Sequence, residues 1–189
     1  MGKEDIERDM PLSIEDEAAI LNVLVGMERT FFTLALETAM RMRECYPLDV
    51  KQVSLAKRTI HLERSKNGDH RQVPLSSVAT TLLAEYMTAN AEAMGMRDGR
   101  LFSCWNGSTS VRELDSTTSE VSRIFRTAFA QAGLRELHFH DLRHEATCRL
   151  YERTSLSDVL IAKITGHRDV RMLRRYASLR GSDLAGHLW

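Results

Sequence analysis

A short β-prone segment lies between long helical segments, and it limits the folds that this chain can adopt. Residues 50–55, 58–63 and 70–75 are each too short for a helix and have the character of strands. Asn67-Gly68 lies between the second and third runs, and this dipeptide is typical of a tight turn between antiparallel strands. We therefore predict a small three-stranded antiparallel sheet, with Lys66 at the tip of its second hairpin.

The rest of the chain has the patterns of helices. Ser13 and Asp16 are spaced like a capping box that opens a helix ending near Val25. Further helices are expected over residues 28–42, from Ser76 or Ser77 to about 93, and over 117–132 and 141–151. These patterns predict a mainly helical α+β fold, with residues 12–189 as one domain and residues 1–11 as a linker or frayed end.

Apolar stripes on two of these helices predict the core. The first stripe joins Phe31, Leu34, Ala35 and Thr38. The second lies on the helix predicted over residues 117–132, which ends at Gly133 and has the apolar residues Val121, Ile124, Phe125, Ala128 and Phe129.

Composition narrows the class of protein. The chain has 189 residues, 43% of them hydrophobic and 28% charged, which is typical of a globular domain. No apolar run approaches the length of a membrane span, and the N-terminus lacks the features of a signal peptide. Cys45, Cys104 and Cys148 have neither metal-ligand nor disulfide spacing, so we expect a cytoplasmic protein without a metal site.

The net charge of zero conceals an uneven distribution. Residues 1–37 carry three basic and nine acidic side chains, so the remainder carries an excess of basic ones. Several arginines lie close to Tyr176: Arg168, Arg171, Arg174, Arg175 and Arg180. Such a cluster can bind phosphate groups even in a neutral chain.

Groups suited to phosphoryl transfer follow one another near the C-terminus. His140 and Arg143 are three residues apart and share one face of a helix. His167 follows Gly166, which can end a helix, and Tyr176 lies further along. An arginine can pair with two phosphate oxygens, a histidine can exchange a proton near neutral pH, and a tyrosine oxygen can be a nucleophile. Together they suggest a covalent phosphotyrosine intermediate.

The order of these groups is similar to a known signature. His140-Asp141-Leu142-Arg143-His144, then Ile164-Thr165-Gly166-His167, then Arg175-Tyr176 resembles the catalytic domain of the tyrosine recombinases, the phage integrase family. The resemblance implies that Tyr176 is the nucleophile, that Arg143 holds the phosphate, and that His167 contacts the phosphate and steers Tyr176. It makes His140 a general base or a hydrogen-bond donor.

A second segment resembles the family's first arginine motif. Residues 38–44, with Leu48 beyond, align so that Arg41 matches the first catalytic arginine and Glu44 the acid that orients it. Ala39 replaces the usual glycine, and Arg43 stands where a small residue is usual. Arg43 therefore competes with Arg41 for the assignment, and its other expected role is to bind DNA.

The predicted hairpin supplies the remaining catalytic group. Ser65-Lys66-Asn67-Gly68 and Arg71 to Leu75 look like the family's β-hairpin, which makes Lys66 the general acid for the leaving 5′ oxygen. The resemblance implies neither a metal nor another cofactor, because the guanidinium groups replace a metal ion.

Double-stranded DNA is the partner that the resemblance implies. Expected DNA contacts come from Arg43, Arg71, Arg123, Arg126, Arg168 and Arg175. The family works as a homo-oligomer, a tetramer on DNA, and its short C-terminal tails, here residues 177–189, often dock on a neighbouring protomer. The family also has an N-terminal DNA-clamping domain, which we expect to be missing from this sequence. A phage or mobile element of a prokaryotic cell is the expected source.

The implied function is site-specific DNA recombination through a 3′-phosphotyrosine. Two alternatives stay open: a nicking-closing enzyme of the type IB topoisomerase kind, and a DNA-binding module without catalysis.

Overall fold

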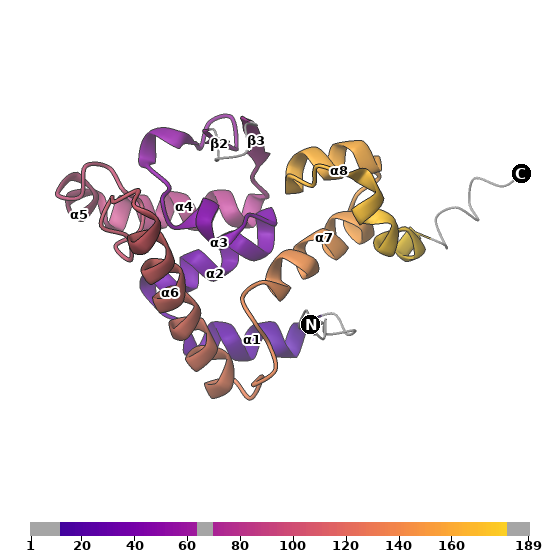
Figure 1. The fold of residues 1–189 in the computed structure, drawn as a ribbon, viewed down its shortest axis with the longest axis horizontal. Coiled ribbons are helices and arrows are strands. Elements are labelled where there is room, and N and C mark those ends of the chain that lie inside the picture. Colours follow the sequence, from indigo (N-terminus) through magenta and orange to yellow (C-terminus); the bar gives the residue numbers. More distant parts are fainter. Residues whose placement is uncertain (1–11, 64–69, 181–189) are drawn as a thin grey trace, which may run out of the picture.

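The computed structural model describes residues 12–63 and 70–180, and the fold is helical around one small sheet, as predicted. Lys66 lies outside the described residues, as do the linker 1–11 and the end of the tail, 181–189. Figure 1 shows helices α1 to α6 grouped around a common centre, while α7 leads away to α8 and the final helical segment.

The first helices differ in one place from the prediction. α1 (Ile14–Val23) begins with the expected capping box of Ser13 and Asp16. α2 (Gly26–Thr38) ends at Ala39, which adopts a left-handed conformation with φ 55°, and α3 (Met42–Cys45) is a separate short helix. The prediction of one helix over residues 28–42 was therefore wrong, because a left-handed residue cannot continue an α-helix.

The sheet has the predicted three strands in the order β1-β2-β3, all antiparallel. β2 (Thr59–Leu62) pairs with β3 (Arg71–Pro74), so that Leu62 lies opposite Arg71. β1 is only Val53–Ser54, because residues 50–52 form a 3-10 turn, η1 (Val50–Gln52). The Asp49 side chain accepts a hydrogen bond from Lys51 N and caps this turn, which shortens the strand expected from residue 50.

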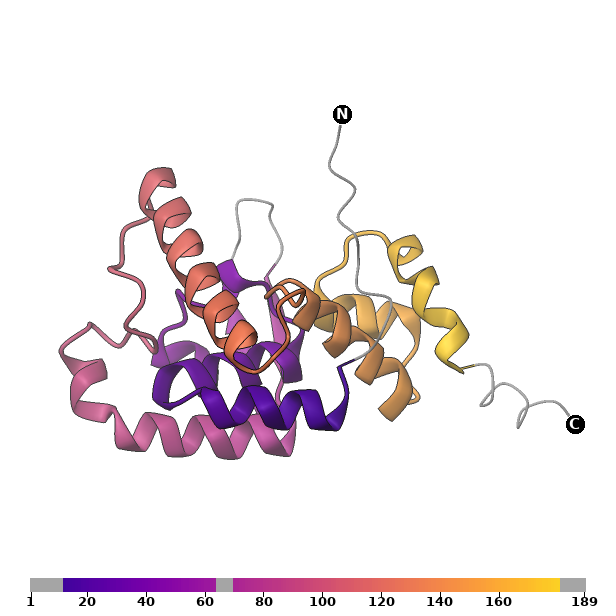
Figure 2. The same ribbon diagram turned by 90° about the horizontal axis from the view of Figure 1, so that it is seen from below.

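The remaining helices follow the predicted order with shifted ends. α4 (Ser77–Ala89) is capped by Ser76 and is followed by a separate turn, α5 (Ala91–Gly95). α6 (Val111–Gln131) starts before the predicted residue 117, with Ser110 as its cap. α7 (Asp141–Arg153), α8 (Asp158–Thr165) and the 3-10 segment η2 (Val170–Arg180) complete the chain. In Figure 2, α1 and α4 run across the view and α6 runs obliquely to both.

Two apolar clusters stabilise these elements. The larger includes the predicted stripes except for Thr38, which is buried but polar, and Ile124, which is only partly buried. The Phe31 ring packs in it against Phe102, Phe125 and Phe139 at centroid distances of 4.9–5.5 Å. A smaller cluster joins the second half of α7 to α8 and η2 through Cys148, Tyr151, Ile161, Ala162, Leu173 and Tyr176. The predicted nucleophile therefore belongs to the smaller cluster.

A buried ionic network attaches α1 to α7. Arg149 donates to Glu145 on its own helix at 2.8 Å and to Glu17 of α1 at 2.6 Å. Glu145 also accepts from Leu12 N at 2.9 Å. The acidic first helix thus has a cationic partner inside the protein.

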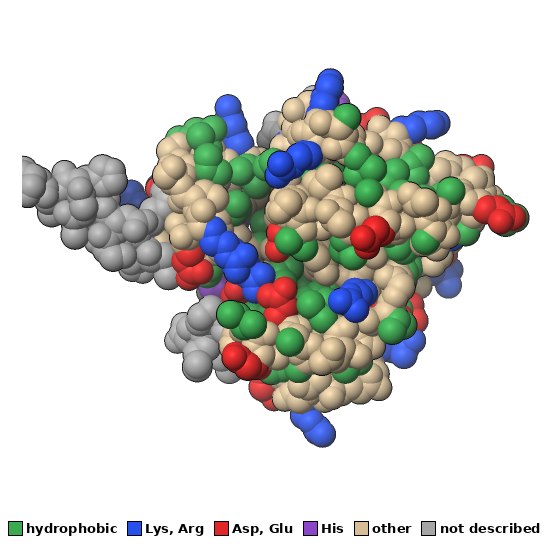
Figure 3. All heavy atoms as spheres, turned by 180° about the vertical axis from the view of Figure 1, so that it is seen from behind, with side chains coloured by type: hydrophobic (Ala, Val, Ile, Leu, Met, Phe, Trp, Pro, Cys, Tyr) green, Lys and Arg blue, Asp and Glu red, His purple; other side chains and the backbone are tan. Residues whose placement is uncertain are grey.

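The surface on the side of α4 carries charges of both signs. Figure 3 shows Lys and Arg side chains dispersed among Asp and Glu side chains and small apolar areas. Among the described residues, no helix is both long and apolar enough to cross a membrane.

Candidate active site

Arg143 is the buried centre of the site. It lies in the first turn of α7 and is only 6% exposed. Its Nη1 donates to Ala39 O at 2.6 Å and to Thr165 O at 2.5 Å, and its Nη2 lies 3.2 Å from His167 Nε2. Burial and then the nearby Arg41 lower the pKa of Arg143 to about 10, so it is still charged at neutral pH.

His167 is held as a neutral imidazole. Gly166 ends α8 with φ 74°, and this turn places His167 Nδ1 2.6 Å from Thr165 Oγ1. Thr165 Oγ1 gives its own proton to Ile161 O, so it accepts from Nδ1–H, and Nε2 accepts from Arg143. Burial, followed by the charges of Arg143 and Arg41, lowers the pKa of His167 to about 4.

Arg41 reaches the same turn from the other side. Its Nη2 donates to Gly166 O at 3.1 Å, and its Nη1 lies 3.3 Å from Glu44 Oε1. Glu44 Oε2 also accepts from Arg41 N at 2.7 Å, so the acid holds both the backbone and the side chain of Arg41. Arg41 and Arg143 thus both donate to carbonyls in the turn that ends α8.

Arg71 shares Glu44 with Arg41. Its Nη1 and Nη2 lie 2.6 and 2.9 Å from the two Glu44 oxygens, and both side chains are about 15% exposed. Burial raises the pKa of Glu44, but the hydrogen bonds and charge of Arg71, with the amide and charge of Arg41, outweigh it and leave this pKa below its usual value. A Cβ on Gly166 would lie 2.4 Å from Arg71 Nη1, so the turn packs directly on this guanidinium.

Arg43 points to a different part of the molecule. Its Nε donates to Thr118 at 3.1 Å and its Nη2 pairs with Asp115, both on α6. Of the two competing arginines, Arg41 is the one that the structure brings to Gly166 and Glu44. Geometry therefore favours Arg41 for the role of the first phosphate-binding arginine.

Tyr176 completes the set from η2. Its side chain is 5% exposed, and its ring stacks on Tyr151 with centroids 5.7 Å apart. Its Oη lies 2.9 Å from Nδ1 of His144, the last residue of the His140–His144 motif, for which the family resemblance implied no role. A cavity of about 100 Å³ brings the candidate nucleophile together with Arg143 and His167, whereas Arg41 does not line it. Its lining residues are His140, Asp141, Arg143, His144, His167, Met172, Arg175 and Tyr176.

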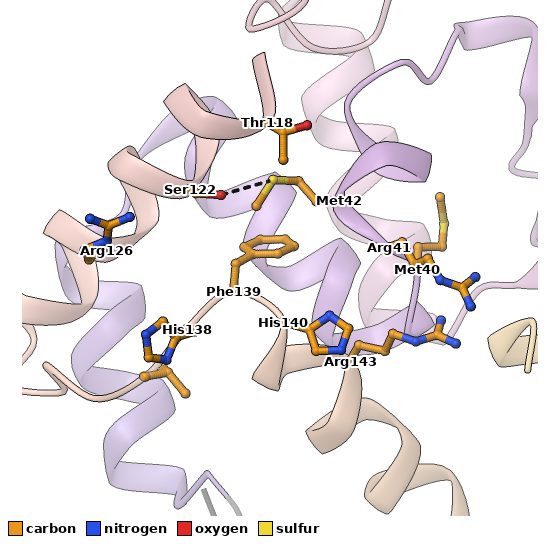
Figure 4. A pocket seen from close by; sticks show the side chains of 11 residues that line it. Met40, Arg41, Met42, Thr118, Ser122, Arg126, His138, Phe139, His140 and Arg143 are labelled. Carbon is orange, nitrogen blue, oxygen red and sulfur yellow. Dashed lines mark hydrogen bonds between the residues drawn. The ribbon is translucent and has the colours of Figure 1, made fainter. Parts of the chain in front are cut away.

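A larger cavity of about 350 Å³ adjoins this one and shares His140 and Arg143 with it. Figure 4 shows Phe139 near its middle, Arg126 and His138 toward one end, and Arg41 and Arg143 toward the other. Met40, Met42 and Leu137 add apolar lining, so the cavity combines an apolar wall with cationic ends. His140 is exposed and lines both cavities.

The predicted DNA-binding arginines lie in different environments. Arg71 is largely buried against Glu44, and Arg123 pairs with Glu120 on α6 at 2.6 Å. Arg126, Arg168 and Arg175 are exposed, and the Arg175 guanidinium lies 5.9 Å from the centre of the Tyr176 ring. The role of each in binding DNA stays a prediction. In residues 12–63 and 70–180, no cluster of three His, Cys, Asp or Glu side chains could hold a metal ion.

Comparison with known proteins identifies the family. A sequence model of the phage integrase family matches residues 2–182. The chain belongs to the phage integrase family. This integrase domain is 39% identical over 157 residues to a shufflon-specific DNA recombinase of Escherichia coli, an alignment that covers 83% of the chain and 36% of the relative. The domain spans only about a third of the length of the first curated relatives it matches, with 36% and 34% covered.

Solved structures have the same fold. The integrase domain superposes on the crystal structure of XerA recombinase with a TM-score of 0.74 at 21% identity, covering 95% of this chain and 65% of the other. It also superposes on XerH recombinase in a post-cleavage complex with its difH substrate, with a TM-score of 0.68 at 22% identity, covering 95% and 53%. The predicted fold class, a helical catalytic domain with a three-stranded antiparallel sheet, is confirmed.

Proposed function

We propose that this integrase domain cuts and rejoins DNA strands at a specific site through a covalent 3′-phosphotyrosine. One observation carries the proposal: in a chain of the phage integrase family, Arg143, His167 and Tyr176 line the same cavity. Its relatives include proteins named as a shufflon-specific DNA recombinase and as the integrase of Salmonella phage P22. Both names agree with action on duplex DNA.

The chemistry follows from the charge that develops on the phosphate. Arg41 and Arg143 would hold the non-bridging oxygens, because fixed guanidinium groups stabilise the charge of the transition state. His167 Nε2 lies close to Arg143, and once it is protonated beside the phosphate anion it would donate to the same phosphate. Tyr176 Oη attacks phosphorus, and Lys66 would give a proton to the leaving 5′ oxygen. His140 would assist as a hydrogen-bond donor or base at the exposed edge of the cavity.

The phosphotyrosyl bond retains the energy of the broken phosphodiester, so religation needs no nucleotide cofactor. Exchange between two duplexes needs four strand cleavages, and we propose that four copies assemble on DNA. We further propose that the activity takes place in the cytoplasm of a prokaryotic cell, on phage or other mobile DNA; the relatives from Escherichia coli and Salmonella phage P22 support this.

Covalent trapping tests the proposal. A pool of duplexes with random sequence, each nicked so that cleavage releases a short strand, should yield a protein–DNA adduct with a few selected sequences. Tyr176→Phe should form no adduct while still binding the selected duplex, because only the nucleophilic oxygen is lost. An adduct in Tyr176→Phe would move the nucleophile to another residue.

The same duplexes separate the alternatives. A topoisomerase-like enzyme would relax plasmids that lack any selected site, and a binding module would give no adduct with any duplex. The sequence relationship to a shufflon-specific DNA recombinase favours site-specific recombination over either.

A further inference from the structure

His144 touches the oxygen that would attack the phosphate. Its Nδ1 lies 2.9 Å from Tyr176 Oη, and the two ring centroids are 5.1 Å apart. Both residues line the small cavity that also contains Arg143 and His167. His144 is therefore in contact with the reacting atom and next to the expected position of the phosphate.

The other end of the His144 ring fixes the direction of this hydrogen bond. His144 Nε2 lies 3.7 Å from Cys148 Sγ, one helical turn further along α7. A thiol is a weak partner, so the contact with Tyr176 decides which ring nitrogen carries the proton. A phenol is a good donor and an unprotonated imidazole nitrogen a good acceptor. The stable pairing is thus Tyr176 Oη–H donating to His144 Nδ1, with the imidazole proton on Nε2.

His167, the other half-buried histidine of the cavity, is engaged differently. Its Nδ1–H is given to Thr165, and its Nε2 accepts from Arg143. Because the lone pair of His167 Nε2 already accepts a hydrogen bond from Arg143, it is not available to take the proton of Tyr176. Both ring nitrogens of His167 are thus already engaged, while His144 Nδ1 is arranged to receive a proton.

We propose that His144 is a catalytic residue that takes the proton of Tyr176 during strand cleavage and returns it during religation. In cleavage, the Oη–H bond breaks and the proton passes to His144 Nδ1, while Oη forms a bond to phosphorus and the 5′ oxygen leaves with a proton from the general acid. In religation, the 5′ hydroxyl returns its proton to the conjugate base of the general acid and forms a bond to phosphorus, the Oη–phosphorus bond breaks, and imidazolium Nδ1–H protonates Oη. This role rests on the proposed function, since it concerns the same reaction.

Two substitutions of His144 separate proton transfer from positioning. His144→Ala removes the acceptor, whereas His144→Asn puts an amide oxygen near the place of Nδ1 and keeps an acceptor that cannot take the proton. We expect both variants to form the covalent adduct about 10² to 10⁴ times more slowly than the parent, the usual range for acid–base catalysis. Near-parental rates in His144→Asn would mean that His144 only positions Tyr176, and would overturn the proposal.

A change in the nucleophile supplies the second readout. Difluorotyrosine at position 176 ionises more easily than tyrosine, so its attack depends less on a base. In that background the loss caused by His144→Ala should shrink to about tenfold or less. His140→Ala is the matched control, and its defect should not shrink. An equal defect of His144→Ala on both nucleophiles, or a shrinking defect for His140→Ala instead, would overturn the assignment.

Failure of this inference is distinguishable from failure of the proposed function. Adduct formation by the parent together with parental rates in both His144 variants would reject the role of His144 and leave the recombinase proposal intact. No adduct by the parent with any duplex of the pool would reject both. Thermal melting of each variant identifies a loss that comes from unfolding, and His144→Asn retains the hydrogen bond to Tyr176 if His144→Ala does not fold.

Discussion

Removal of the Glu44 carboxylate should destabilise the protein more than removal of any exposed acid. Glu44 receives two hydrogen bonds from Arg71, and both side chains are about 15% exposed. Arg71 Nε is buried and has no hydrogen-bond partner within residues 12–63 and 70–180. In Glu44→Ala, the Arg71 guanidinium would remain in the protein with its main counter-charge gone.

The size of the effect follows from this burial. Removing one partner of a buried ion pair costs about 3–5 kcal/mol, because the remaining charge is uncompensated. For a domain of this size, each kcal/mol lowers the melting temperature by roughly 2–4 °C. Glu44→Ala should therefore lower the melting temperature by about 6–20 °C. Arg71→Ala should lower it less, because Glu44 keeps Arg41 as a cationic partner. The double variant should cost much less than the sum of the two single effects, since the Arg41 side chain that then lacks a carboxylate is half exposed to water.

Calorimetry or circular dichroism on the two single variants and the double variant measures this coupling. Glu120→Ala is the matched control, because its pair with Arg123 has the same 2.6 Å distance but is exposed, so little stability should be lost. The folded-state pKa of Glu44 is lowered, so its contribution is present above pH 4.5 and is lost as the pH falls below that value. A melting temperature of Glu44→Ala within about 2 °C of the parent, or additive single effects, would refute the reasoning.

Other predictions concern the chemistry. If Lys66 is the general acid, Lys66→Ala should slow cleavage by about 10² to 10⁴. Replacing the bridging 5′ oxygen of the DNA by sulfur should restore cleavage by Lys66→Ala, because a thiolate leaves without a proton. The same DNA should not restore cleavage by Arg41→Ala. Equal defects of Lys66→Ala on both substrates would exclude that role. Cleavage should persist in EDTA, because guanidinium groups supply the positive charge; Mg²⁺-dependent activity would contradict this. DNA binding by this chain alone should be weak and should fall steeply with salt in a fluorescence titration. The His167 resonance should titrate near pH 4 in the free protein and at higher pH with bound phosphate, and no change on binding would separate His167 from the phosphate site.

The sequence motifs predicted the residues of the site more accurately than the sequence patterns predicted the ends of the helices. The family motifs led to Arg41, Arg143, His167 and Tyr176, and the structure brings these together although more than 130 residues separate the first and last. Motif order works here because Arg41, Arg143 and His167 stand at a helix end or start, and such ends can be recognised from Gly166 and similar residues.

Three features could not be found in this way. The break of α2 at Ala39 depends on a left-handed alanine, and intrinsic propensity favours alanine inside a helix. The only hint was that the family usually has glycine at this position. The contact between His144 and Tyr176 joins α7 to η2, and a tertiary contact of this kind has no local sequence pattern. The pairing of Arg71 with Glu44 was missed for the same reason, because an isolated arginine in a strand resembles a surface residue.

The two carbonyls bound by Arg143 have an electrostatic consequence. Ala39 O and Thr165 O lie at the C-terminal ends of α2 and α8, so the partial negative poles of two helix dipoles meet at one guanidinium. These poles offset the repulsion among Arg41, Arg71 and Arg143 and keep the Arg143 fork in place before any anion arrives. Both Nη1 hydrogens are engaged in this way, so an incoming phosphate can bind the rest of the fork without displacing the backbone. DNA would therefore bind to an Arg143 guanidinium that is already rigid and oriented. In the free protein, the NMR signals of the Arg143 side-chain N–H groups should be sharp, and these hydrogens should exchange slowly with water.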